Sequence, residues 1–162
     1  LGEGQLVQLA ADLIRKGVPA AVIEEKIRKI IPHIYTLFCT PNLSYLNKSG
    51  FIDIGQSTAG EMMSLSPIFS LEDGKLNPLD KVKNIRNVID YFLEFLDEFD
   101  DLESVYFIQP SPPAYIESKL IRQKVEETFP HTVYSEHTIN PFLASLIGPR
   151  GYGIVISEKT VD

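Results

Sequence analysis

The chain has 162 residues, 44% of them apolar, and a mean hydropathy near zero, which is typical of one globular domain or slightly more. Its formal net charge of −7 and its pI near 5.0 argue against non-specific nucleic-acid binding, because that binding depends on basic patches that neutralise phosphates. No stretch of about 18 uninterrupted apolar residues predicts a transmembrane segment, and no leader pattern predicts secretion. A single cysteine, Cys39, excludes an intrachain disulfide, and we expect a cytoplasmic protein.

Two helices are predicted at the start of the chain. Apolar residues recur at helical spacing within residues 5–16, and Gly17 can end that helix. Pro19 then opens a second amphipathic helix, so the pair predicts an αα-hairpin. Because residues 1–33 contain no predicted strand, we interpret them as the terminal helices of a truncated first domain and residues 34–162 as a second domain.

The remainder of the chain alternates between strand and helix patterns. Short runs of β-branched and aromatic residues indicate strands, and apolar residues three and four apart indicate helices. The expected strands are 34–39, 67–71, 75–83, 104–109, 132–136 and 153–157. The expected helices are 42–48, 57–64, 85–99 and 115–129, with residues 140–146 forming a short helix or a loop. We therefore predict an α/β (α+β) fold with a mixed sheet of five to six strands flanked by helices.

Local signals add detail to this order. A tight turn is expected at residues 72–74, and Pro78 places the strand after it at a sheet edge or a bulge, because proline cannot donate a ladder hydrogen bond. Asn84 is a good N-cap for the longest helix. The helix at 115–129 is expected to bury Ile116, Leu120, Ile121, Val125 and Phe129.

No constellation of reactive side chains predicts catalysis. The three histidines, His33, His131 and His137, are interpreted as ordinary loop or boundary residues, and their spacing predicts no zinc site. The acidic run from Glu94 to Glu103 is interpreted as a solvated helix end and loop. The Gly-x-Ser-x-Gly elbow and the P-loop pattern are missing, although a Ser-His-Asp triad built from distant residues stays open. The sequence therefore favours a binding protein without metal or cofactor over an enzyme.

One apolar segment fits either a binding pocket or an ordinary core. Met62 and Met63 are adjacent, and methionine suits flexible ligands because its side chain is unbranched and polarisable. Apolar residues that are close enough in sequence to line the same pocket are Ile52, Ile54, Leu65, Ile68 and Phe69. From this segment alone, core packing is the simpler interpretation. Residues 148–151 are also open, as a tight turn or as a loop whose Arg150 faces an anionic group.

The order of these segments resembles the second domain of DegV-family proteins, a bacterial family that binds fatty acids. Residues 44–52, SYLNKSGFI, resemble the family's Tyr-Leu-x-Lys-Gly-Gly-Arg-Ile motif. Residues 67–75, PIFSLEDGK, are similar to its Lys-Pro-Ile-Leu-x-Leu-Glu-Asp-Gly segment. Residues 148–156 resemble its Gly-Pro-Gly-Ala-Leu-Gly loop and closing strand. The resemblance covers nearly the whole chain.

The resemblance implies a two-domain α/β protein that holds a fatty acid between its domains, with no cofactor and no catalysis of its own. The family presents the bound acid to a separate fatty acid kinase, which phosphorylates the carboxylate. Residues 34–162 would then be the C-terminal lipid-binding domain, and the missing N-terminal domain would be a further partner. The residues expected to line the tail pocket are Ile52, Ile54, Met62, Met63, Leu65, Ile68, Phe142 and Leu146. Those expected near the head group are Lys83, Ser145 and Arg150.

Departures from the family motifs leave other functions open. Phe51 stands where the family motif has Arg, and Leu146 stands where its glycine-rich loop has His. At both positions a bulky apolar side chain replaces a polar one. This also fits a divergent paralogue whose tunnel is filled and which serves as a structural or regulatory interaction domain. An enzyme related by fold is a third option, and it would require a phosphate or metal constellation.

Overall fold

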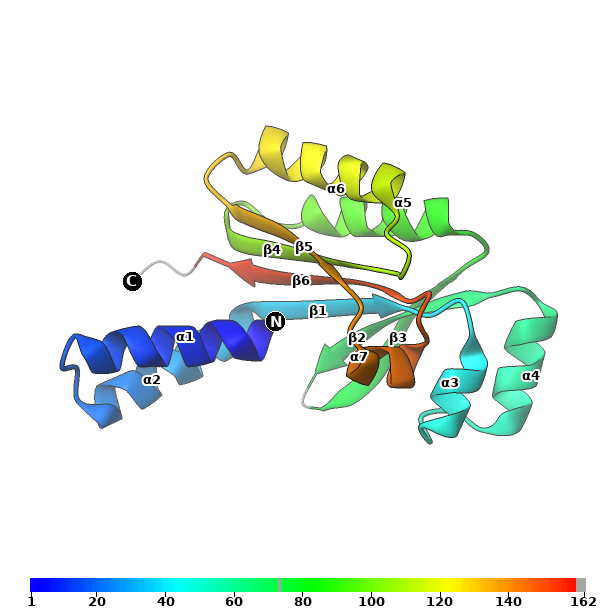
Figure 1. Cartoon of the computed structure of the whole chain (residues 1–162), viewed down its shortest axis with the longest axis horizontal. Coiled ribbons are helices and arrows are strands. Elements are labelled where there is room, and N and C mark those ends of the chain that lie inside the picture. The colour runs from blue at the N-terminus through cyan, green and yellow to red at the C-terminus, as the bar shows by residue number, and fades with distance from the viewer. Residues whose placement is uncertain (73, 160–162) are drawn as a thin grey trace.

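The computed structural model describes residues 1–72 and 74–159, which form a mixed six-stranded sheet with helices on both faces (Figure 1). The strands are β1 (Ile34–Cys39), β2 (Ser66–Glu72), β3 (Lys75–Val82), β4 (Leu102–Gln109), β5 (Val133–Thr138) and β6 (Tyr152–Glu158). The helices are α1 (Gly2–Arg15), α2 (Ala20–Ile30), α3 (Leu43–Lys48), α4 (Ile54–Met62), α5 (Ile85–Leu96), α6 (Tyr115–Thr128) and α7 (Pro141–Ile147), and a 3-10 turn spans Ile31–His33. The predicted α/β fold is confirmed.

The strand order is β3-β2-β1-β6-β4-β5, and every neighbouring pair is antiparallel except β4 with β5. The edge position predicted for the strand containing Pro78 is confirmed, because β3 has β2 as its single neighbour in the sheet. The register between β2 and β3 also shifts between Ile68, opposite Asp80, and Phe69, opposite Pro78. The sheet therefore accommodates the proline at both an edge and an irregularity. The predicted turn at 72–74 includes residue 73, which lies outside the described residues.

The two faces of the sheet have separate cores because successive strand residues point to opposite sides. On β1, Leu37 and Cys39 belong to the core beneath α5 and α6, whereas Phe38 belongs to the core on the other face. On β6, Ile154 and Ile156 face α5 and α6, and the residue between them faces away. Helices α5 and α6 lie side by side over the first face, while α1, α3 and α7 lie on the second (Figure 1).

Helix α6 buries a narrower stripe than the sequence predicts. Ile121 and Val125 are fully buried, as expected, but Ile116 is 76% exposed and Leu120 is also exposed. Each helical residue is rotated by about 100° from the one before, so Leu120 lies to the side of the Ile121–Val125 stripe. The helix covers the edge pair β4 and β5, and this edge contacts one stripe of it.

The predicted αα-hairpin at the start of the chain is present, but its apolar stripes are only partly covered. Ile23 is the one buried residue of α2, whereas Ile14, Val22 and Ile31 are exposed. Helix α2 contacts mainly α1 and the 3-10 turn that follows it, so it has a single partner for its apolar face.

Cys39 is expected to be chemically inert in the folded chain. Its side chain is 1% exposed in β1, and burial raises the pKa of the thiol to about 12, so the reactive thiolate is scarce near neutral pH. Iodoacetamide at neutral pH should leave the native chain unmodified and alkylate it once guanidinium has unfolded it, as read by mass. Rapid alkylation of the native chain would show that β1 opens to solvent.

Candidate functional site

A cavity of about 880 Å³ lies on the second face of the sheet, between the start of α1, the β2–β3 hairpin and α7. Its volume is within the range of about 300–1,000 Å³ that is usual for small-molecule sites. The lining is mostly apolar, and its members come from segments at both ends of the chain. They are Leu1, Gly2, Glu3, Leu6, Ile31, Ile34, Thr36, Phe38, Phe51, Leu71, Leu76, Ile108, His137, Thr138, Asn140, Phe142, Leu143, Leu146, Ile147 and Val155.

The floor of the cavity is formed by the central strands. Thr36 on β1 lies opposite Val155 on β6, and Phe38 lies two residues further along β1. Since side chains of a strand alternate between faces, Thr36 and Phe38 point to the same side. Ile108 of β4 extends this floor beyond β6. The floor is thus a rigid part of the sheet and does not depend on loops.

Helix α7 forms one wall, and local interactions fix its position. Asn140 caps its start, because the side-chain oxygen accepts a hydrogen bond from the Leu143 amide at 2.8 Å. At its end, the buried Thr40 hydroxyl after β1 donates to the Ile147 carbonyl at 2.6 Å. The chain then turns at Gly148, whose φ of +86° favours glycine. Helix α7 is therefore held to the central strand at its C-terminal end.

Helix α1 forms another wall by lying close against the sheet. A Cβ added to Gly2 would lie 2.9 Å from Ile34 Cγ2, so a larger side chain would push the helix away. One turn later, the Gln5 amide donates to the Ser104 hydroxyl on β4. These contacts bring Leu1 and Leu6 to the cavity.

A second cavity of about 740 Å³ adjoins the first beneath α1. The two share Leu1, Leu6, Ile34 and His137 as wall residues. The second cavity is more polar in its residue types, with Glu103, Ser135 and Glu158 among its lining. The first cavity is thus mostly apolar, and the adjoining one under α1 is more polar.

His137 marks the boundary between the two cavities. It lies on β5, which extends two residues beyond the predicted strand, and its Nε2 is 2.9 Å from Ser135 Oγ. Its ring lies against Tyr106 with the centroids 5.8 Å apart. The sequence analysis interpreted His137 as an ordinary loop or boundary residue and so did not place it in the wall of a cavity. Its spacing of two residues from Ser135 was the sequence feature that could have indicated this, because it places both side chains on one face of a strand.

The predicted tail residues do not all come together. Phe142 and Leu146 line the large cavity, and Ile52 packs against the core of the same face. Ile68 is fully buried, but in the core beneath α5 and α6, so the sheet separates it from the cavity. Helix α4 packs against α3, and the large apolar side chains of Ile54, of Met62 at 83% and of Met63 just after the helix are exposed. Leu65 is half-buried between α4 and β2.

The three predicted head-group residues lie apart from the cavity and from one another. Lys83 is exposed beside the start of α5. Ser145 is on the outer side of α7 and donates to the Phe142 carbonyl at 2.7 Å. Arg150 borders a small hollow of about 120 Å³ with Pro41. Their role at a head group stays a prediction.

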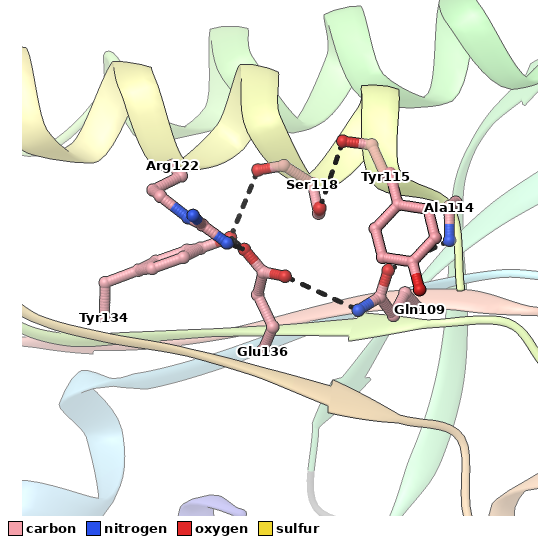
Figure 2. A network of polar contacts seen from close by, with 7 residues as sticks. All are labelled: Gln109, Ala114, Tyr115, Ser118, Arg122, Tyr134 and Glu136. Atoms are coloured by element: carbon pink, nitrogen blue, oxygen red, sulfur yellow. Dashed lines mark hydrogen bonds and ion pairs between the residues drawn. The ribbon is translucent and has the colours of Figure 1, made fainter.

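A separate polar network joins α6 to the sheet on the first face (Figure 2). Glu136 accepts hydrogen bonds from Arg122 and from the Tyr134 hydroxyl, the latter at 3.1 Å. Gln109 completes it by accepting from the Ala114 amide at 3.0 Å. Burial, and after it the nearby negative charge of Glu136, raises the pKa of Tyr134 above its usual range. The side chains of this network hydrogen-bond to one another, which indicates a structural role in holding α6 to the sheet.

No group of three or more His, Cys, Asp or Glu within residues 1–72 and 74–159 is placed to hold a metal ion. Within the same residues, no helix is both long and apolar enough to cross a bilayer.

A family model described as "Uncharacterised protein, DegV family" matches residues 1–159. A DegV domain-containing protein of Staphylococcus aureus is 26% identical over 156 residues, which is 94% of this chain and 54% of that protein. Another, from Caldanaerobacter subterraneus, is 30% identical over 96 residues, or 59% of this chain and 34% of that protein. The chain spans about half the length of the first of these relatives.

Solved structures share the fold. A protein described as a fatty acid binding DegV family protein from Streptococcus agalactiae matches with a TM-score of 0.80 at 21% identity, over 97% of this chain and 56% of that chain. The Streptococcus pneumoniae fatty acid kinase (Fak) B3 protein, loaded with linoleic acid, matches with a TM-score of 0.80 at 16% identity, over 96% and 55%. A DegV family protein from Eubacterium eligens, loaded with heptadecanoic acid, matches with a TM-score of 0.78 at 13% identity, over 95% and 56%.

Proposed function

The chain belongs to the DegV family, and from this membership we propose that it binds a long-chain fatty acid in the cavity between α1, α7 and the central strands. The observation that carries the proposal is the cavity itself, whose volume of about 880 Å³ and mostly apolar lining suit an acyl chain. Structural neighbours described as fatty acid binding, or as loaded with linoleic or heptadecanoic acid, support the choice of ligand.

The energetics of this site come from the acyl chain. Burying each methylene contributes about 0.8 kcal/mol, so roughly 15 methylenes contribute on the order of 12 kcal/mol before other terms. Association costs an estimated 4–15 kcal/mol in lost freedom, so the net affinity depends on how much of the tail the walls cover. Phe142, Leu143 and Leu146 on α7 and Leu71 and Leu76 on the hairpin supply that cover.

The cavity also bears on the alternative of a filled tunnel. Phe51 and Leu146 are the two bulky departures from the family motifs, and both line the open space without closing it. A structural or regulatory module with a filled tunnel would lack a cavity of this size. The open cavity therefore favours a carrier.

The proposed role is non-catalytic. The chain would hold the acid, and a separate kinase would phosphorylate the carboxylate, in the cytoplasm. The support is the structural neighbour named as a fatty acid kinase B3 protein, together with a site built from apolar side chains. We further propose that residues 1–33 end a first domain that would complete the site, because the chain matches about half of its relatives' length.

Native mass spectrometry of the chain, purified without added lipid and then mixed with palmitate or oleate, tests the binding. We expect a one-to-one adduct in the fatty-acid mass range, either carried through purification or formed on addition. Denaturing spectra of the same sample should release the free acid and return the bare chain mass. A chain that is isolated bare and also ignores both acids would contradict the proposal and support the interaction module.

A further inference from the structure

The large cavity has few polar side chains, and most of them are unsuited to an acidic head group. Those on its lining are Glu3, Thr36, His137, Thr138 and Asn140. The Glu3 carboxylate repels an anion, and the Asn140 side-chain oxygen already caps α7. Of the five, His137 is the one that can carry a positive charge. His137 is therefore the polar residue of this lining best suited to bind an anionic head group.

The hydrogen bond from Ser135 orients the imidazole of His137. Ser135 Oγ lies 2.9 Å from Nε2 and either donates to the neutral ring or accepts from the imidazolium, and in both cases Nδ1 carries a proton and is a donor. Among residues 1–72 and 74–159, no side chain or backbone group is hydrogen-bonded to Nδ1 of His137. The Nδ1 donor on the cavity wall thus remains available to a ligand.

The charged residues around His137 determine which end of the ligand lies toward α1 and which toward α7. The adjoining cavity under α1 is lined by three carboxylates, those of Asp12, Glu103 and Glu158, and by one cation, Lys159, which is paired with Asp101 at 2.9 Å. The carboxylates outnumber the cation and disfavour an anion deeper in that cavity. The apolar side toward α7 holds a hydrocarbon chain instead. The favoured position for a carboxylate is the boundary between the two cavities.

We infer that His137 binds the carboxylate of the ligand and selects free long-chain acids over their uncharged esters. This inference rests on the proposed fatty-acid binding and adds a head-group site that differs from Lys83, Ser145 and Arg150. A carboxylate accepts a charge-assisted hydrogen bond from the imidazole, whereas the methyl ester offers only a neutral acceptor. The acyl tail contributes equally to both ligands.

The test compares the affinities of the chain for palmitate and for methyl palmitate, by competition with a fluorescent fatty acid. We expect the wild-type chain to prefer palmitate by about tenfold or more. His137→Leu should bring that ratio close to one by weakening palmitate while leaving the ester unchanged. His137→Gln keeps a hydrogen-bond donor without the charge, so its preference for palmitate should lie between those of the wild type and of His137→Leu. This variant provides the test if the leucine variant does not fold. His131→Leu, an exposed histidine outside both cavities, is the matched control.

The outcomes separate this inference from the function on which it rests. Equal wild-type affinities for acid and ester, or an unchanged preference in both His137 variants, would overturn the head-group assignment while fatty-acid binding stands. Failure of the wild-type chain to bind either ligand would overturn the proposed function, and the assignment with it.

Discussion

Replacing Thr36 by tryptophan should abolish fatty-acid binding and leave the chain folded. Thr36 is half-buried at the centre of β1, and its side chain lines the floor of the large cavity opposite Val155. An indole at this point projects into the space that the acyl chain would fill, while aromatic residues are well tolerated in strands. We expect palmitate affinity to fall by about a hundredfold or more, since more than 2–3 kcal/mol of buried tail is displaced.

Leu79→Trp is the matched control for this variant, because it adds the same indole to an exposed position on the edge strand β3. Titration with palmitate should give wild-type affinity for Leu79→Trp, and both variants should keep the wild-type thermal midpoint within a few degrees. Near-normal binding by a folded Thr36→Trp chain would show that the ligand does not lie above the central strands.

Phe92→Ala should be the most destabilising single truncation of the core beneath α5. Phe92 is fully buried on α5, together with Val88, Ile89 and Leu96. Removing a buried phenylalanine costs the transfer energy of the ring and leaves a cavity, about 3–5 kcal/mol in all. That is a large fraction of the roughly 5–15 kcal/mol that holds a typical domain together.

Urea unfolding followed by circular dichroism measures the effect as a change in the free energy of unfolding. Phe142→Ala is the matched control, since that ring is 74% exposed and its loss should change stability by less than about 0.5 kcal/mol. The control should instead weaken lipid binding, because Phe142 lines the cavity. A loss below about 1 kcal/mol for Phe92→Ala would mean that α5 does not pack on the sheet as described.

The sequence predicted the elements well because each has a local signal. Alternating and helical periodicities, the Asn84 cap and Pro78 at the sheet edge are all set by neighbours within a few residues. The exposure of Ile116 and Leu120 on α6 was not predictable in the same way. Both fit a helical apolar pattern, and how much of that pattern is covered depends on the edge of the sheet that the helix meets.

The site was harder to predict for the same reason. The tail pocket was sought within residues 52–68, where apolar residues are dense, yet most of them are exposed on or just after α4 or lie on the other face of the sheet from the cavity. Phe142 and Leu146, which line the cavity, were chosen through the resemblance to the family, not through periodicity. The remaining walls, from Leu1 to Val155, are far apart in sequence, and no local pattern reports that they meet.

The central position of β6 bears on when this molecule can exist during its synthesis. Ile34 pairs with Ser157, so the middle of the sheet joins an early strand to the last one. Until β6 leaves the ribosome, β1 to β3 and β4 to β5 are two separate groups of strands with nothing between them. The sheet is therefore completed only once β6 is available to join the two groups, as expected for a topology rich in distant contacts. The cavity floor crosses that same seam, so a bound lipid would report that the two groups of strands have joined.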